Sequence, residues 1–203
     1  MVQKVLKILK HYIKLLNKIK SVFNKAEEDF IRHFKDNYIN DRNKDFNMLP
    51  PFWIVSEIIM FGEIKNIYAS LKKNQFSNGN QKNELDRLAN SFGAINLSEL
   101  NRWLIYIKLI RNRCAHHSRV WNTNYFAVPD LIQKKFNRLN IPPSIPNRIY
   151  SFLVILNIII KKLELNINLK DEIENLMIEY LIFDEMKDSA GFPKNWDTDI
   201  FWN

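Results

Sequence analysis

Hydrophobic residues recur at alternating steps of three and four along most of the chain, which is the spacing of one face of an α-helix. Strand-like alternation is scarce, and the sequence contains only 4 glycines. We therefore predict an all-α fold, a helical bundle with additional helices. The pattern is most regular over residues 2–23, where one apolar stripe is formed by Val2, Val5, Leu9, Tyr12, Leu16, Ile19 and Phe23.

Prolines and polar runs divide the rest of the chain. Pro51 can open a helix, because proline is tolerated in a first helical turn. Pro129 and the Ile-Pro-Pro segment at 141–143 bracket a short helix. Polar residues at 41–47 and 76–80 indicate loops. We predict further helices over 26–38, over 52–71, from about 97 onwards, over 149–163 and over 171–184.

The helices predicted over 52–71 and from about 97 onwards have well-defined apolar faces. Ser98 is the predicted N-cap of the helix that begins near 97, because its hydroxyl can accept a hydrogen bond from a free backbone N–H. The only cysteine, Cys114, excludes an internal disulfide, which suits a reducing compartment. The side chains expected in the core are Phe52, Val55, Ile59, Ile67 and Leu71 from one helix, and Leu100, Trp103, Leu104, Ile107, Ile110 and Cys114 from the other.

The composition fits a single folded domain over residues 1–203, since 46% of the residues are hydrophobic. The longest apolar run, 149–160, is interrupted by Ser151 and Asn157 and is shorter than the roughly 20 residues that span a bilayer. Lysines interrupt the apolar N-terminus, so we predict no secretion signal and a cytoplasmic protein. The segment 191–196 is expected to be a coil held by aromatic anchors.

Charge is unevenly distributed along the chain. Residues 1–25 form a basic amphipathic helix, whereas residues 171–203 contain nine acids against two lysines. Because the total charge is +8, the chain without that acidic segment carries +15. A basic body favours a polyanionic partner such as RNA. A solvated lysine-rich surface without a partner explains the same charge, and the first helix could also contact a partner helix or a membrane surface.

A cluster of basic and polar residues follows the helix that begins near 97. Residues 111–119 read Arg-Asn-Arg-Cys-Ala-His-His-Ser-Arg, and the stretch 102–138 contains eight basic residues and one acid. Asn112 and His116 are four residues apart, so the amide is well placed to hydrogen-bond the imidazole. Arg111 and His116 are five apart, about 140° around a helix. Both can reach one phosphate only through a long arginine, or where the helix ends or bends near His116.

These residue types suit RNA cleavage without a metal. Such cleavage needs a proton taken from the ribose 2′-hydroxyl, charge stabilised on the phosphorane and a proton supplied to the leaving 5′-oxygen. Histidine, with an unperturbed pKa of about 6.5, can make either proton transfer near neutral pH. Arginine stays charged and offers a fork that matches phosphate oxygens. A second copy of the site, from a partner chain, would supply the missing acid or base.

On the residues alone, an ordinary helix end explains the cluster better than catalysis does. A helix C-terminus favours cations, which accounts for His117 and Arg119. No second Cys or His pair stands at ligand spacing, so no metal is predicted. A nucleophilic pair of Cys114 and His116 is disfavoured, because the cysteine falls on the apolar face. The sequence contains no glycine-rich phosphate loop, and we predict no cofactor.

The surrounding sequence, however, resembles a known family. The run at 109–122, Leu-Ile-Arg-Asn-Arg-Cys-Ala-His-His-Ser-Arg-Val-Trp-Asn, is similar to the signature of the Abi-like family, bacterial abortive-infection proteins of the AbiD and AbiF kind. Leu-Pro-Pro-Phe-Trp at 49–53, with the glutamate and the Phe-Gly pair that follow, resembles a second block. Gly-Phe-Pro at 191–193, with two later tryptophans, resembles a third. The order of the blocks makes this resemblance more specific than the Arg-to-His spacing.

The resemblance implies a divergent HEPN bundle that pairs two Arg-Asn-x-x-x-His motifs in a homodimer. It implies that Arg111 and His116 are catalytic and that Asn112 supports them. It also implies a metal-independent endoribonuclease of phage defence, often a toxin restrained by an RNA or protein antitoxin. The roles that follow are phosphate binding for Arg111, proton transfer for His116 and orientation of the histidine for Asn112. Supporting or RNA-binding candidates are Arg113, His117, Arg119, Lys108 and Arg102.

Two functions are therefore carried forward. The first is an endoribonuclease that acts on RNA and needs no cofactor. The alternative is a catalytically inactive helical module that binds RNA or a partner protein through the same basic surface. An interaction protein whose N-terminal helix lies on a membrane surface is the least favoured reading, and we predict no membrane partner.

Overall fold

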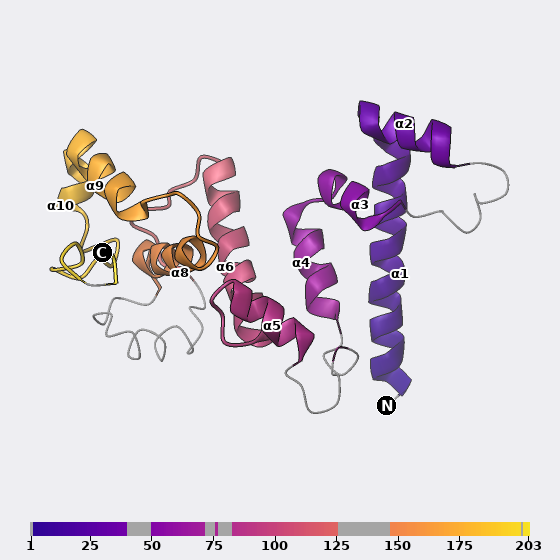
Figure 1. The fold of residues 1–203 in the computed structure, drawn as a ribbon, viewed down its shortest axis with the longest axis horizontal. Coiled ribbons are helices and arrows are strands. Elements are labelled where there is room, and N and C mark those ends of the chain that lie inside the picture. The colour runs from indigo at the N-terminus through magenta and orange to yellow at the C-terminus, as the bar shows by residue number, and fades with distance from the viewer. Residues whose placement is uncertain (1, 40–49, 72–75, 77–82, 126–146, 200) are drawn as a thin grey trace. The chain divides into compact units, whose positions relative to one another are not determined.

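The computed structural model describes most of the chain, namely residues 2–39, 50–71, 76, 83–125, 147–199 and 201–203. Every regular element in these residues is a helix, which confirms the predicted all-α fold (Figure 1). The loop expected at 41–47, nearly all of the loop expected at 76–80 and the short helix expected before 141–143 lie outside the described residues.

The helices belong to two compact units, residues 1–70 and 71–203, each of which is considered by itself. The single domain predicted over 1–203 stays a prediction. The first unit contains α1 (Val2–Lys25), α2 (Asp29–Tyr38), α3 (Phe52–Ile58) and α4 (Phe61–Ser70). The second contains α5 (Glu84–Ser91), α6 (Leu97–Ala115), α8 (Ile149–Lys162), α9 (Leu169–Glu179) and α10 (Leu181–Glu185).

The core of the first unit lies along the C-terminal part of α1. Ile19 is buried there in a small apolar cluster with residues of α3 and its C-cap. Phe23 is buried in a second cluster with residues of α2 and α3. Lys18, on the same helix, forms an ion pair with Glu63 of α4. Tyr12, by contrast, is exposed, so the apolar stripe predicted over residues 2–23 is not buried along its whole length. Among the side chains of α1 that the structure describes, those in the two apolar clusters are Leu15, Ile19 and Phe23.

The helix predicted over 52–71 is wrong as a single element, because the chain breaks between α3 and α4. The backbone of Ile59 is extended (φ −95°, ψ 154°), and the carbonyl of Met60 accepts the first hydrogen bonds of α4. The break packs the Ile59 side chain against Ile19. Phe52, in the first turn of α3, is exposed rather than in the core.

The second unit is built on α6 and α8. On α6, Trp103, Tyr106 and Ile110 are buried, and α8 buries seven residues, as its apolar sequence predicted. Burial, together with the neighbouring Tyr125, raises the pKa of Tyr106. The N-cap of α6 is Asn96, whose side chain accepts a hydrogen bond from the Glu99 N–H at 3.0 Å.

The predicted N-cap, Ser98, is therefore wrong by two positions. It lies inside α6, where its hydroxyl accepts a hydrogen bond from Arg102 at 3.3 Å. Leu104 and Ile107 are only half-buried, whereas Glu99 and Tyr106, which were not predicted to face the core, are buried. The buried face of α6 is therefore rotated relative to the predicted one.

Aromatic side chains anchor the C-terminal segment, as predicted. Phe192, Trp196 and Trp202 are all buried within the second unit. The indole N–H of Trp202 donates to the Tyr150 hydroxyl of α8 at 3.0 Å, and burial raises the pKa of Tyr150 to about 12. This segment is thus a part of the core of the second unit and not a solvated tail.

We expect Gly93→Ala to lower the free energy of unfolding by about 3 kcal/mol. Gly93, in the turn between α5 and α6, has φ +84°, and an added Cβ would lie 2.6 Å from Ile158 Cγ2 of α8. The substitution therefore combines a left-handed backbone with a clash. Urea unfolding measures the effect, and the exposed Ser91→Ala should stay within about 0.5 kcal/mol as a control. Equal stability of both variants would contradict the close approach.

Candidate active site

The candidate residues lie where α6 ends. The N–H of His117 donates to the Cys114 carbonyl at 3.1 Å, and the N–H of Ser118 donates to the Arg113 carbonyl at 2.8 Å. This pair of hydrogen bonds is a Schellman motif, in which the first residue after the C-cap takes a left-handed conformation. His117 occupies that position with φ +51°, and His116 is the C-cap. The helix therefore ends at His116, one of the conditions under which Arg111 and His116 could serve one phosphate.

The three proposed catalytic residues lie within one short stretch at the surface. Arg111 and His116 are exposed, and Asn112 is half-buried. The Asn112 side-chain oxygen accepts a hydrogen bond from the Arg111 guanidinium at 3.3 Å, and its carbonyl accepts the His116 backbone N–H at 3.0 Å. Among the described residues, no hydrogen bond joins the Asn112 amide to the His116 ring. In this structure Asn112 therefore positions Arg111, and its role toward the histidine stays a prediction.

Arg113 holds the chain segment that follows the motif. Its guanidinium donates to the Arg119 carbonyl at 3.0 Å and lies 5.5 Å from the centre of the Tyr125 ring. Tyr125 is buried, and its hydroxyl donates to the Val120 carbonyl at 2.6 Å. Burial is the largest cause that raises the Tyr125 pKa, and the Arg113 charge opposes it. The fold thus uses Arg113 to close the turn after α6, whereas its contact with RNA stays a prediction.

The remaining RNA-binding candidates flank this turn. Arg119 and His117 are exposed beside it, and Lys108 is half-buried two turns earlier on α6. Arg102 lies further toward the N-terminus of α6, where it bonds Ser98. The candidates therefore extend along α6 and around its C-terminal end, rather than converging in a pocket.

Cys114 was expected in the core, and this expectation is wrong, because the thiol is exposed. It lies four residues after Ile110, on the side of α6 that faces the core, but Ile110 is the last buried residue of the helix. The final turn extends past the side chains that cover that face.

No group of three metal-ligating side chains occurs in the described part of the chain.

Aromatic packing that the sequence did not predict fixes the segment after the motif. The Trp121 ring stacks on Phe192 with centroids 5.4 Å apart and packs against Phe183 of α10. Its indole N–H donates to the Met186 carbonyl at 3.3 Å. Trp121 lies in the run that resembles the Abi-like signature, and this resemblance was the one sequence feature that pointed to its importance. Tyr125, three residues beyond that run, carried no signal of its own.

The fold and the site define an all-α protein with an exposed Arg/His motif at the end of a central helix. The sequence matches the model of the family described as Abi-like protein over residues 3–122. The chain belongs to the Abi-like family, which suggests a role in abortive infection, the defence against phage. Neither a search of curated proteins nor a search of solved structures found a match. No helix in the described residues has the length and apolar character needed to cross a membrane.

We expect His117→Gly to raise the free energy of unfolding by about 1 kcal/mol. Glycine takes a positive φ without the steric cost that a histidine side chain meets there. The adjacent His116→Gly is the matched control. His116 has φ −101°, so glycine brings no relief and should lower stability by about 0.5 kcal/mol. Urea unfolding of both variants tests this, and equal effects would contradict the helix end described above.

Proposed function

We propose that the protein is a metal-independent endoribonuclease of the HEPN kind, acting in abortive infection or as the toxin of a toxin–antitoxin pair. The observation that carries the proposal is the exposure of Arg111 and His116 at the end of α6, within the family match that reaches residue 122. The excess of basic over acidic residues at 102–138 supports an RNA substrate.

The proposed reaction is attack of the ribose 2′-oxygen on the adjacent phosphorus. A histidine takes the 2′-hydroxyl proton, the phosphorus–oxygen bond to the 5′-oxygen breaks, and that oxygen receives a proton. The products are a 2′,3′-cyclic phosphate and a 5′-hydroxyl. Arg111 binds the non-bridging oxygens as negative charge builds on them. His116 makes one of the proton transfers, and Asn112 holds the Arg111 guanidinium.

One copy of the chain provides an open surface with few reacting groups, so we propose that two copies form the site. Ile105 and Leu109 of α6 are exposed at 54% and 36%, although both are large and apolar. They lie at helical spacing with Asn112 and His116, on the face of α6 opposite its buried residues. Pairing of two such faces would cover the apolar side chains and bring two motifs together.

The nuclease proposal predicts that purified protein degrades total RNA in the presence of EDTA. Arg111→Ala/His116→Ala should slow cleavage by about 100-fold or more, because it removes a proton-transfer group and the phosphate charge. The matched control is Arg87→Ala/His33→Ala, which removes the same residue types from exposed positions outside the motif. Gel analysis of RNA fragments over time gives the rates.

Equal rates for wild type and the motif variant would refute the nuclease proposal. Binding of RNA without cleavage, lost in the motif variant, would instead favour the inactive RNA-binding module. Growth arrest on expression of wild type and the control variant, but not of the motif variant, would support a toxin.

The dimer proposal predicts that Ile105→Glu/Leu109→Glu yields a monomer with little nuclease activity, because charged side chains are costly to bury across an apolar interface. Light scattering measures the mass of the particle. Leu88→Glu/Ile167→Glu makes the same exchange at two other exposed positions of the second unit and should leave the dimer intact. A wild-type monomer at high protein concentration, or a monomeric variant with full activity, would contradict the composite site.

A further inference from the structure

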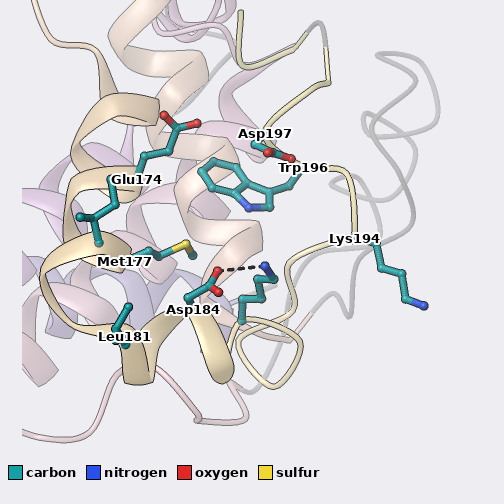
Figure 2. Close-up of a pocket in the computed structure, with 9 residues that line it drawn as sticks. Glu174, Met177, Leu181, Asp184, Lys194, Trp196 and Asp197 are labelled. Atoms are coloured by element: carbon teal, nitrogen blue, oxygen red, sulfur yellow. Dashed lines mark hydrogen bonds and ion pairs between the residues drawn. The ribbon is translucent and has the colours of Figure 1, made fainter.

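A cavity of about 360 Å³ lies between α9, α10 and the C-terminal coil, within the second unit (Figure 2). None of the candidate catalytic residues lines it. Its walls combine carboxylates with the ring of Trp196 and the thioether of Met177. The proposed nuclease function leaves this cavity without a role.

The charges at the cavity leave acidic groups available. Asp184 pairs with Lys187 at 2.9 Å, and Figure 2 shows the Lys194 side chain directed away from the other labelled residues. Glu174 forms a long ion pair with Lys170 of its own helix at 3.7 Å. Asp197 forms no ion pair among the described residues, although its charge acts on Lys187. A cation that enters the cavity therefore competes with Lys170 for Glu174, but it reaches Asp197 without displacing the Asp184–Lys187 pair.

Trp196 supplies a second, independent indication of a ligand. Its side chain is only 3% exposed, yet its indole N–H has no hydrogen-bond partner among the described residues. Figure 2 shows the indole nitrogen on the side of the ring toward Met177 and Asp184, within the cavity wall. An indole N–H that faces a cavity can donate a hydrogen bond to an acceptor of a bound partner, which a peptide carbonyl could supply.

An apolar patch adjoins the cavity where α9 meets α10. Ile178 and Leu181 line the cavity and are exposed at 73% and 71%. Tyr180 and Ile182, which flank Leu181 in the sequence, are exposed as well. Consecutive large apolar residues at a surface mark a docking site for another protein more often than scattered ones do.

We propose that this surface, the cavity together with the patch, binds a basic amphipathic segment of a partner protein. A lysine or arginine of that segment enters the cavity between the Trp196 ring, Glu174 and Asp197. Its neighbouring apolar side chains cover Ile178 and Leu181. Charge complementarity selects this occupant. The cavity lining contains three carboxylates and two lysines, and the segment 171–203 as a whole contains nine acids and two lysines, which repel nucleic acid. The interaction does not depend on the proposed nuclease activity.

The test uses the full chain and a fluorescein-labelled peptide of repeated lysine–leucine–alanine triplets, with binding followed by fluorescence anisotropy. We expect Glu174→Gln/Asp197→Asn to weaken binding by about tenfold. Glu27→Gln/Glu164→Gln removes the same number of charges at exposed positions that do not line the cavity, and it should leave the affinity unchanged. Ile178→Ser/Leu181→Ser should also weaken binding, and all the substituted side chains except the half-buried Glu174 are exposed, so the fold is retained.

Tighter binding of wild type to the lysine peptide than to a peptide with glutamate in place of lysine is also expected. Equal affinities of the cavity variant and the charge-matched control would overturn the proposal. Binding of a labelled RNA that depends on Glu174 and Asp197 would overturn it as well. Because cleavage of RNA is not measured, these outcomes are separate from the fate of the nuclease proposal.

Discussion

Burial of one face of α6 is the constraint on which the candidate site depends. Trp103, Tyr106 and Ile110 fix the rotation of this helix in the second unit, and the helix continues past its last buried residue. Its final turn and its C-cap, His116, therefore stand at the surface. The same rotation that buries Trp103 leaves Ile105 and Leu109 exposed on the opposite face. Burial of this one face of α6 thus determines both the exposure of the motif and the position of the apolar surface beside it.

The turn after α6 is held by interactions that reach far along the chain. Arg113 closes it through the Arg119 carbonyl and the Tyr125 ring, and Trp121 packs against aromatic residues of α10 and the C-terminal coil. These contacts keep the backbone around His117 in its left-handed conformation. The C-terminal coil, although outside the family match, is therefore connected physically to the segment that carries the motif.

The sequence predicted the helices better than the details that tertiary packing decides. Periodicity identified α1 and α6, and a long apolar run identified α8. The break at Ile59 was not predicted from the local pattern, and it accompanies packing of Ile59 with Ile19, which lies far away in the sequence. The exposure of Cys114 depends on where neighbouring side chains stop covering α6, which periodicity does not encode. The helix end at His116 was one of the arrangements considered, and it is the one observed.

The sequence predicted which residues form the candidate site, but it did not predict the contacts between them. Residue types and the family resemblance identified Arg111 and His116, whereas the hydrogen bond from Arg111 to Asn112 and the contact of Arg113 with Tyr125 emerged only from the folded chain. Ile105 and Leu109 were not among the side chains predicted to face the core, but only the folded chain shows that they stay exposed at the surface.

The central claim is that Arg111 and His116 promote attack of the 2′-hydroxyl on RNA. The chemistry of the new RNA ends tests it most directly, by mass spectrometry of fragments produced by wild-type protein in EDTA. The proposed mechanism predicts 2′,3′-cyclic phosphate or its hydrolysis product, a 3′-phosphate, paired with 5′-hydroxyl ends. Fragments with 3′-hydroxyl and 5′-phosphate ends would contradict it, because a water or metal-activated nucleophile, and not the ribose, would then have attacked the phosphorus.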